Sequence, residues 1–197
     1  MNQGTIEDEN REWRRTTKNG DYLVSSAVHN LDIDWINNAF DSKDMHWAKS
    51  LPRAQISTML SQSLTLGLYK TSSKTSIERN DGSPSVTETV SSKEAGASRE
   101  HLQQVGMARF ITDYITFAYL TDVYIQDDHR GFDLGKWLVK CCEEIMQTMP
   151  ALRRGMLLTS AEVGKKFYSR ELGFYDVDQE RDYMICMTRR AYEPHVE

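Results

Sequence analysis

The chain of 197 residues contains 39% hydrophobic and 27% charged residues, a balance typical of a soluble globular protein and unlike that of a disordered or membrane-embedded chain. Its length suits one domain with a sizeable core. The formal net charge of -5 argues against broad binding to a phosphate backbone, so no nucleic-acid partner is expected, and it mildly favours a cationic partner such as an amine.

The first stretch, residues 1–20, is polar and mixes acidic with basic side chains. It is unlike a secretory signal or an acid-poor transit peptide, and the chain contains no run of 18 apolar residues. We therefore expect a flexible N-terminal tail, no membrane partner and a cytoplasmic protein, with a nuclear location left open.

The pattern before residue 71 predicts one strand, two helices and a further strand. A short strand is expected at residues 22–28. Residues 31–40 and 51–63 repeat apolar side chains every three to four positions, which predicts two helices. Residues 63–69, SLTLGLY, alternate in the way that strands do.

Residues 71–100 differ from both flanks, because they hold 12 serines or threonines in 30 residues and no aromatic side chain. Such a segment cannot bury enough apolar area to offset the entropy of ordering it. Each flank alone is too incomplete to form a fold. We therefore expect a flexible surface insertion inside a single domain that covers residues 21–197.

The segments after residue 100 predict a hairpin and the clearest helix of the chain. Residues 102–111 and 116–125 are rich in β-branched and aromatic residues and flank a turn-like segment, which predicts an antiparallel hairpin. Residues 134–149 keep the helical spacing until Pro150 ends it.

Three shorter elements complete the chain. Residues 155–159 predict a buried strand, residues 163–171 a short helix closed by Gly173, and residues 183–188 a last strand. The full order, β-α-α-β-β-β-α-β-α-β, is an α+β arrangement.

The cysteines and histidines indicate neither a disulfide framework nor a metal site. Cys141 and Cys142 are adjacent in a helical pattern, where a mutual disulfide would be strained, so a reducing compartment is expected. The five histidines are scattered, and no Cys/His group has the spacing of a zinc site. The sequence therefore predicts no metal.

The segment most informative about function is residues 122–138, a strand followed by a short polar loop and a helix start. A helix start leaves four N–H groups unpaired and carries roughly half a positive charge, so this layout suits an anion such as pyrophosphate. Gly131 and Gly135 allow close approach of the backbone, while Arg130 and Lys136 add charge. Many loops of this kind bind nothing, so the layout alone leaves both interpretations open.

The motif R-G-F-D-L-G at residues 130–135 resembles the acyl-coenzyme A loop of the GNAT acetyltransferases, Q/R-x-x-G-x-G/A, and matches its first and last marked positions. The motif F-Y-S-R-E-L-G-F at residues 167–174 is similar to the second signature of that family. Residues 119–125 and 157–160 resemble a subgroup of small enzymes in which D-V-F/Y-V leads directly into the loop. The resemblance covers residues 105–174 well and the first seventy residues only loosely.

The resemblance implies a GNAT-like fold, which is a mixed, mainly antiparallel sheet with a splayed central strand pair, flanked by helices. It also implies acetyl-coenzyme A as co-substrate, with its pantetheine arm in the gap between the strand of Val123 and the strand that begins near Gly155. Backbone N–H groups of the loop would hold the pyrophosphate. The cofactor-binding residues implied in this way are Val123, Tyr124, Ile125, Arg130, Gly131, Phe132, Asp133, Leu134, Gly135 and Lys136.

The same resemblance implies an N-acetyltransferase in which an amine attacks the thioester directly, so that no nucleophilic Cys or Ser is needed. The expected acceptor is a primary amine of a small molecule or a lysine, and a homodimer is left open. Tyr168 falls where the family often places a tyrosine that protonates or hydrogen-bonds the leaving thiolate. The alternative for Tyr168 is an aromatic side chain packed under the last strand.

The general base is less clearly marked, because residues 117–125 lack the glutamate that many relatives use. Asp122 is the only acid in that stretch. It is assigned as the base, acting directly or through a water, although an acid at a strand position is as often a structural carboxylate. His46, His129 and Glu162 are weaker candidates, each more readily explained as a surface residue.

Asp133 departs from the family pattern, since it stands where a middle glycine is usual. Two unit charges about 5 Å apart repel by roughly 3 kcal/mol at an effective dielectric constant near 20, about a hundredfold in affinity. Asp is also a favoured helix N-cap, so its carboxylate competes with a phosphate for the same N–H groups. A further possibility is that Arg130 and Lys136 neutralise it.

Two functions therefore stay open. The leading one is an acetyl-coenzyme A dependent N-acetyltransferase; the alternative is a non-catalytic GNAT-fold module that binds an acyl-coenzyme A weakly or a protein partner. The acceptor pocket is expected from residues 31–63 and the loop before the last strand. Trp35, Phe40 and Trp47 are aromatic candidates for its lining, although helical spacing also explains Trp35 and Phe40 as core.

Overall fold

A computed structural model describes residues 10–72, 101–159, 162–177 and 186–187. The chain forms two compact units, Met1–Leu157 and Leu158–Glu197. Residues 73–100 of the expected insertion lie outside the described residues, as does most of the last strand expected at residues 183–188.

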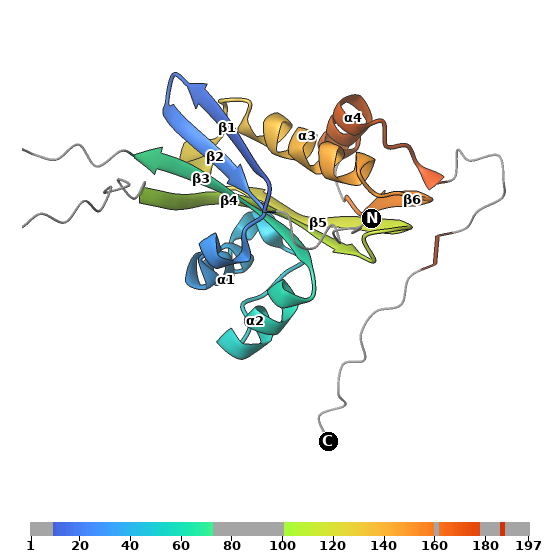
Figure 1. The fold of residues 1–197 in the computed structure, drawn as a ribbon, viewed down its shortest axis with the longest axis horizontal. Coiled ribbons are helices and arrows are strands. Elements are labelled where there is room, and N and C mark those ends of the chain that lie inside the picture. Colours follow the sequence, from blue (N-terminus) through green and yellow to red (C-terminus); the bar gives the residue numbers. More distant parts are fainter. Residues whose placement is uncertain (1–9, 73–100, 160–161, 178–185, 188–197) are drawn as a thin grey trace, which may run out of the picture. The chain divides into compact units, whose positions relative to one another are not determined.

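The first unit is built on a six-stranded sheet whose strands follow chain order (Figure 1). Neighbouring strands from β1 to β5 pair antiparallel, whereas β5 and β6 are parallel. The strands are β1 (Glu12–Thr17), β2 (Gly20–Ser25), β3 (Leu64–Ser72), β4 (His101–Thr112), β5 (Phe117–Ile125) and β6 (Arg154–Leu157). The sheet is therefore mixed and mainly antiparallel, which confirms the predicted fold class.

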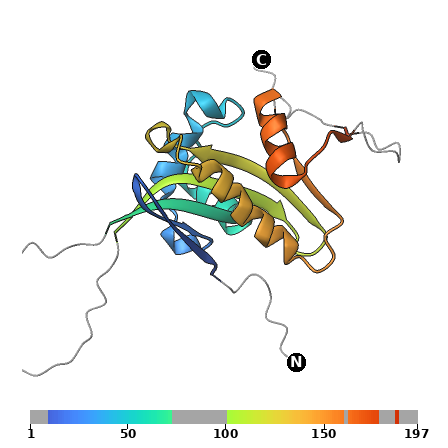
Figure 2. The ribbon, with the colours of Figure 1, turned by 90° about the horizontal axis from the view of Figure 1, so that it is seen from above.

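The helices of the first unit lie on both faces of this sheet. They are α1 (Ile33–Phe40), α2 (Arg53–Ser61) and α3 (Leu134–Gln147), with the 3-10 turns η2 (Val28–Asn30), η3 (Lys43–Met45) and η4 (Asp127–His129). Helices α1 and α2 cover one face and α3 covers the other, where it lies across β4 and β5 (Figures 1 and 2). The three helices predicted for this part of the chain are confirmed, each a few residues shorter than expected.

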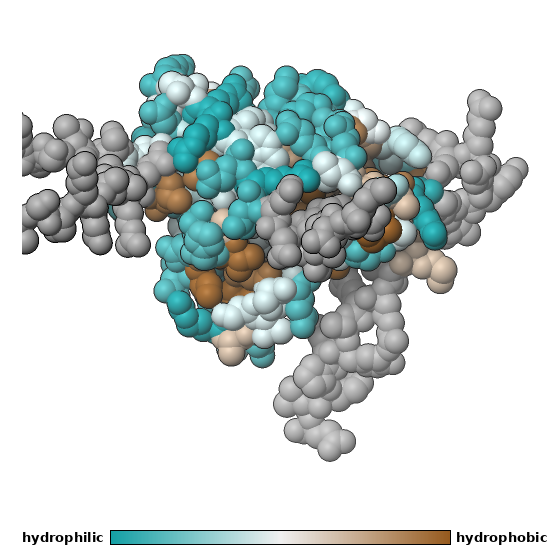
Figure 3. Space-filling view, in the orientation of Figure 1, coloured by the Kyte–Doolittle hydropathy of each residue, from teal (hydrophilic) through white to brown (hydrophobic). Residues whose placement is uncertain are grey.

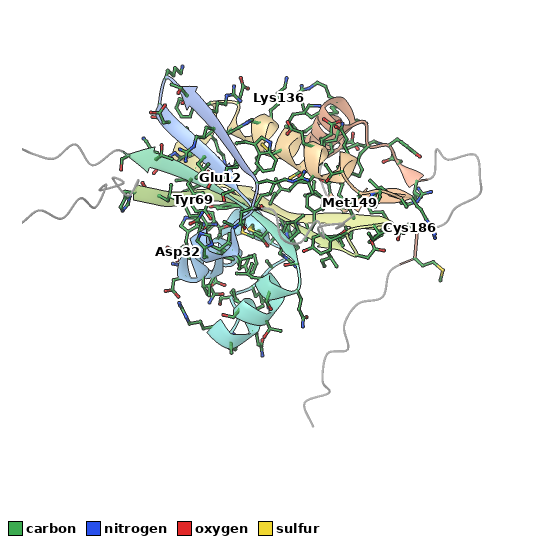
Figure 4. The ribbon with its side chains drawn as sticks, in the orientation of Figure 1. Glu12, Asp32, Tyr69, Lys136, Met149 and Cys186 are labelled. Atoms are coloured by element: carbon green, nitrogen blue, oxygen red, sulfur yellow. The ribbon has the colours of Figure 1, made fainter. Side chains whose placement is uncertain are left out.

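Asp32 is the N-cap residue that precedes α1, and Figure 4 labels it beside that helix. The Asp32 carboxylate accepts the N–H groups of Asp34 and Trp35, both at 3.0 Å, and so satisfies two donors that have no partner within the helix. The buried face of α1 joins α2 and β4 in one core cluster, made of Ile36, Ala39, Phe40, Met45, Ile56, Leu60 and Met107. This cluster fixes α1 and α2 on their face of the sheet.

Some apolar side chains remain partly exposed on the same face. In Figure 3 they gather over α1 and α2. Leu31, Ile33, Leu51 and Met59 pack against the core cluster and are only partly buried. The surface over α1 and α2 is therefore partly apolar.

Helix α3 packs on the opposite face through an apolar stripe. Its buried residues are Leu134, Leu138, Val139, Cys141, Cys142, Ile145 and Met146. Burial raises the pKa of the Cys141 thiol to about 12, and burial also raises the pKa of Cys142. Both thiols are therefore uncharged at neutral pH and act as packing groups rather than as nucleophiles.

Residues 12–17, which we expected inside a flexible tail, form strand β1 instead. β1 pairs with β2 along its whole length, through a tight turn that ends at Gly20 with φ 116°. The Trp13 indole N–H donates to Glu144 Oε2 on α3 at 2.6 Å. The periodic apolar residues that usually reveal a strand are missing here, because β1 packs through an indole and arginine side chains.

Two elements near the C-terminal end follow the predictions in part. The strand expected to be buried at residues 155–159 is β6, whose residues are only half-buried because β6 is the edge strand of the described sheet. In the second unit, the predicted helix is α4 (Glu162–Leu172), and Gly173 directly after it has φ 69°. This left-handed glycine ends the helix as expected.

Candidate functional site

Strands β5 and β6 stay paired for only part of their length. Their parallel register runs from Phe117↔Arg154 to Leu120↔Leu157. Over residues 121–125, β5 has a strand neighbour only on its β4 side within the described part of the chain. The ladder ends there because β6 itself ends at Leu157, so the expected splay of the strand pair remains a prediction.

A β-bulge lies at the start of this open edge. Between the pairs Met107↔Tyr124 and Arg109↔Thr121, β5 contains one residue more than β4. Asp122 sits in this bulge with φ 51°, a left-handed backbone that Asp and Asn tolerate better than most residues with a side chain. The bulge thus places a carboxylate two residues beyond the last pair of β5 with β6.

The Asp122 carboxylate is buried and accepts hydrogen bonds on both oxygens. Arg109 Nε and Nη2 lie 2.8 and 2.7 Å from Oδ2. Trp47 Nε1 and Thr121 Oγ1 each lie 3.2 Å from Oδ1. Because the side chains of Arg109 and Asp122 are only 11% and 6% exposed, their opposite charges offset each other with little screening by water.

These side chains form a polar group on the α1/α2 face of the sheet, since Arg109 follows Met107 of the core cluster by two positions along β4. We call this group the Asp122 cluster. It consists of Trp47, Arg109, Tyr119, Thr121 and Asp122. Burial raises the pKa of the Tyr119 hydroxyl, and the negative charge of Asp122 raises it further, so Tyr119 stays protonated at neutral pH.

Trp47 connects the Asp122 cluster to the surface. The residue is 54% exposed and lies between η3 and α2. Its ring packs edge-on against that of His46, with 5.1 Å between ring centroids. His46, a weaker candidate for the base, therefore contacts the indole of the cluster and is itself exposed.

The turn after β5 is anchored by His129, another of the weaker candidates. His129 is buried, and its Nδ1 lies 2.9 Å from the Tyr22 hydroxyl on β2. Burial lowers the pKa of His129, and the positive charge of Lys70 lowers it further. A neutral, buried imidazole bonded to a strand is a structural group that fixes the loop on β2.

Arg130 holds the loop together through Nε and Nη2 of its guanidinium. Nε donates to the carbonyl of Ile125 at 2.8 Å, and Nη2 lies 2.7 Å from Asp44 and 2.9 Å from Asp127. The guanidinium also lies over the Tyr124 ring, 5.6 Å from its centroid. The charge of Arg130 is therefore shared with two carboxylates, which leaves less of it for a bound anion.

The residues expected to bind the coenzyme lie on one strand-loop-helix segment. Val123, Tyr124 and Ile125 end β5, the loop contains Arg130, Gly131 and Phe132, and α3 starts with Leu134, Gly135 and Lys136 after Asp133 at its N-cap position. Leu134 is buried, so it offers only its backbone to a ligand. Lys136 extends from the first turn of α3 on the side away from the sheet (Figure 4).

Asp133 does not cap α3, which corrects one expectation from the sequence. Its φ of 57° and ψ of 17° are left-handed, whereas N-cap residues are normally extended, and its side chain makes no capping hydrogen bond. Gly131 is also left-handed, with φ 80° and open space around the position of a Cβ atom. The family usually has its middle glycine at the position of Asp133, and the left-handed backbone there explains that preference. The Asp133 carboxylate leaves the N–H groups at the start of α3 uncapped.

The hairpin of β1 and β2 brings two basic residues to the loop. Arg15 Nη1 lies 3.4 Å from the Asp133 carbonyl, and its guanidinium lies 5.9 Å from the centroid of the Trp137 ring. Lys18 Nζ lies 5.8 Å from the centroid of the Phe132 ring. Positive charge therefore reaches the loop from a part of the chain that the sequence pattern assigned to a tail.

Tyr168 and Glu162 belong to the second unit. Tyr168 is half-buried on α4, with its ring 5.1 Å from that of Phe167 and edge-on to it. Its carbonyl accepts the N–H of Phe174 at 3.4 Å. Glu162 is exposed in the first turn of α4. The expected role of Tyr168 at the leaving thiolate remains a prediction.

The contacts of Arg109 and Trp47 with Asp122 are features of the candidate site that the sequence did not reveal. One local signal for Arg109 exists, since it is the only charged residue in the apolar stretch V-G-M-A-R-F-I at residues 105–111. No local pattern links Trp47 to Asp122, because 75 residues separate them.

Two findings concern metals and membranes. Within the described residues, no three His, Cys, Asp or Glu side chains are grouped as metal ligands. None of the described helices is long and apolar enough to cross a membrane.

Comparisons with known proteins agree on one family. The model of the Acetyltransferase (GNAT) family matches residues 94–174. A protein of Gibberella zeae, named as a putative acetyltransferase, is 39% identical over 157 residues, which cover 80% of this chain and 81% of that protein.

Solved structures agree. One from Xanthomonas campestris pv. campestris, described as a putative acetyltransferase of the GNAT family, is 30% identical with a TM-score of 0.53 and covers 79% of this chain and 84% of that chain. A protein of unknown function and probable acetyltransferase from meticillin-resistant Staphylococcus aureus has a TM-score of 0.54 at 14% identity, covering 85% and 99%. The second likeness supports the fold alone.

Proposed function

The chain belongs to the GNAT family of acetyltransferases, whose members use acetyl-coenzyme A and acetylate amine acceptors, and we propose that it is an N-acetyltransferase acting on a primary amine of a small molecule or a lysine. The amine attacks the thioester directly, without an acyl-enzyme. One observation carries this proposal: Asp122 is a buried carboxylate two residues beyond the last pair of β5 with β6.

The residues present fit acetyl-coenzyme A in two respects. The outer edge of β5 over residues 121–125 lacks a strand neighbour within the described residues, which suits hydrogen bonds to a pantetheine arm. The start of α3 is not capped by Asp133, and Gly131 has open space beside it, so the N–H groups there suit a pyrophosphate. The coenzyme, when bound, supplies an acetyl group activated as a thioester.

Cationic side chains at the loop support the same assignment. Arg15 and Lys18 reach Asp133 and Phe132 from the hairpin of β1 and β2. Lys136 is exposed in the first turn of α3. These positive charges offset the repulsion between Asp133 and a bound phosphate. Arg130 offsets it less, because its charge is shared with the carboxylates of Asp44 and Asp127.

We assign Asp122 as the general base. The acceptor must lose a proton before its nitrogen can attack, and a carboxylate within hydrogen-bond reach can take that proton directly or through a water. Oδ2 is held by Arg109 at 2.7 to 2.8 Å, whereas the contacts on Oδ1 are longer, at 3.2 Å. Oδ1 is therefore the oxygen that receives the proton, and Arg109 is the residue that positions it.

We assign the hydroxyl of Tyr168 to the leaving thiolate. This role follows from the motif F-Y-S-R-E-L-G-F at residues 167–174, in which the family often places such a tyrosine. A hydrogen bond or a proton from Tyr168 would stabilise the negative charge that develops on sulfur.

A non-catalytic module is the second candidate, and two observations favour it. The Asp133 carboxylate adds negative charge at the loop, where a pyrophosphate would lie. The guanidinium of Arg130 is paired with Asp44 and Asp127. Such a module would bind an acyl-coenzyme A weakly or use the same region for a protein partner.

A thiol-release assay separates the two candidates. The full chain is mixed with acetyl-coenzyme A and a panel of primary amines that includes a lysine peptide, and free thiol is followed. An N-acetyltransferase releases thiol only when a suitable amine is present. No release with any amine, together with no thermal shift from the coenzyme, would refute the enzyme, whereas a thermal shift without turnover would support the non-catalytic module.

A further inference from the structure

Trp47 lies against the oxygen of Asp122 that the ion pair with Arg109 does not hold. We infer that Trp47 is a specificity-determining residue of the acceptor site, whose indole N–H occupies on Asp122 Oδ1 the position that the primary ammonium of the acceptor takes. This inference rests on the proposed function, because it assigns a place to the acceptor within the same site.

The first reason is the difference between the two oxygens. Oδ2 has two charge-assisted contacts from the Arg109 guanidinium, at 2.7 and 2.8 Å, in an ion pair that is largely buried. Oδ1 has two neutral donors, Trp47 Nε1 and Thr121 Oγ1, each at 3.2 Å. An ammonium brings a full charge and several N–H donors, so it competes well against an indole on Oδ1 and poorly against Arg109 on Oδ2.

The second reason is that Trp47 is placed to move. It lies in the irregular stretch between η3 and α2, it is 54% exposed, and its ring contact is with the exposed His46. Trp35 is the contrast, because it lies on α1, packs against the core cluster and has its ring 6.0 Å from that of Tyr124. Trp47 is therefore able to leave Oδ1 without opening the core, and Trp35 is not.

The third reason is what the displaced ring then offers. An indole beside a carboxylate presents a π-face to a cation, which adds attraction for an ammonium and none for a neutral or anionic group. A quaternary ammonium has charge but no N–H donor for Oδ1. The site therefore selects an unhindered primary ammonium, with Asp122 accepting its hydrogen bond and Trp47 lying against its charge.

A binding experiment tests this without any need for turnover. The indole ¹H–¹⁵N signals of the full chain are recorded, and the Trp47 signal is identified by its loss in Trp47→Phe. Butylammonium chloride is then titrated, with tetramethylammonium chloride at equal ionic strength and 1-butanol as controls. The matched internal control is Trp13, whose indole also donates to a carboxylate, that of Glu144 on α3.

We expect a saturable shift of the Trp47 signal with butylammonium alone, while the Trp13 signal stays in place. An unchanged Trp47 signal, or one that moves equally with tetramethylammonium, overturns the inference. With an amine that the thiol assay identifies, Trp47→Phe removes the competing N–H and keeps a ring, so the KM for the amine should fall about threefold with kcat nearly unchanged. Trp47→Ala also removes the ring, and its KM should rise about threefold above that of Trp47→Phe.

The control variant Trp13→Phe should change neither kinetic constant. Equal KM values for the Phe and Ala variants at position 47, or a loss confined to kcat, would overturn the role of Trp47. The two proposals fail separately: a Trp47 shift without thiol release refutes the transferase and leaves the ammonium site standing, whereas thiol release without a Trp47 shift refutes the ammonium site alone.

Discussion

Asp122 and Asp133 both have a positive φ and differ in almost everything around them. Their φ angles are 51° and 57°, both left-handed. Asp122 is buried in β5 and accepts hydrogen bonds from Arg109, Trp47 and Thr121. Asp133 is exposed at the start of α3, and its side chain makes no capping hydrogen bond.

This difference shows that the surroundings, rather than the residue type or a positive φ, decide which contacts each carboxylate makes. A buried charge is strongly destabilising unless it is paired, so Asp122 and Arg109 depend on each other. An exposed charge needs no partner and acts mainly on ligands that come close to it. Changes at Asp122 should therefore alter stability and catalysis, and changes at Asp133 should alter coenzyme affinity.

The largest expected effect is that of Arg109→Ala. The variant leaves the Asp122 carboxylate buried without its cation, which should lower the free energy of unfolding by roughly 3–5 kcal/mol, measured by urea denaturation. The matched control is Arg53→Ala, because Arg53 forms an ion pair with Asp34 in which the side chains are 64% and 77% exposed. That loss should stay below about 1 kcal/mol, and similar losses in the two variants would contradict the contrast between buried and exposed charge.

Asp122→Asn should have the next largest effect, on the chemical step. Asn tolerates the left-handed backbone but cannot take the proton of the acceptor, so kcat should fall by roughly 10²- to 10⁴-fold. The coenzyme Kd should stay the same, since the substitution keeps the backbone of β5 and leaves the loop and α3 untouched. Asp34→Asn, an exposed change on α1, serves as the control. The assays are run well below the unfolding temperature, so that a loss of stability does not lower the measured kcat. If the variant kept both the kcat and the pH profile of the parent, Asp122 would not be the base.

At Asp133, two substitutions separate charge from backbone strain. Asp133→Asn removes the charge and keeps a residue that tolerates the left-handed backbone, while Asp133→Gly removes both charge and strain. Both should tighten acetyl-coenzyme A binding by about fivefold, the effect of one charge about 6 Å away at a partly screened surface. Calorimetry that found equal or weaker binding in both variants would show that the carboxylate does not repel the coenzyme.

The smallest effect concerns His129, which anchors the turn between the two aspartates. Burial lowers its pKa in the folded chain, so the unfolded chain takes up a proton first as the pH falls below about 6.5. The free energy of unfolding should therefore decrease from pH 7 towards the lowered pKa. Urea midpoints should show this slope in the parent chain and a flatter one in His129→Gln; identical slopes would indicate that His129 carries no such linkage.

The two aspartates also show which features of the structure could be predicted from the sequence. The loop and α3 were predicted correctly because their signals are local: a helical repeat that Pro150 ends, and glycines between a strand and a helix start. The pattern also marked Asp122 as the only acid on its strand. It was wrong about residues 12–17, where packing relies on indole and guanidinium contacts, which leave no apolar periodicity.

The sequence by itself determined the α+β class, the hairpin, the loop and the family resemblance, because these depend on residues close together in the chain. The tertiary structure alone decided the partners of Asp122 and the orientation of Asp133. Arg109 reaches Asp122 across a β-bulge, and Trp47 reaches it from 75 residues away. Such contacts depend on how the elements pack, whereas periodicity specifies only the elements themselves.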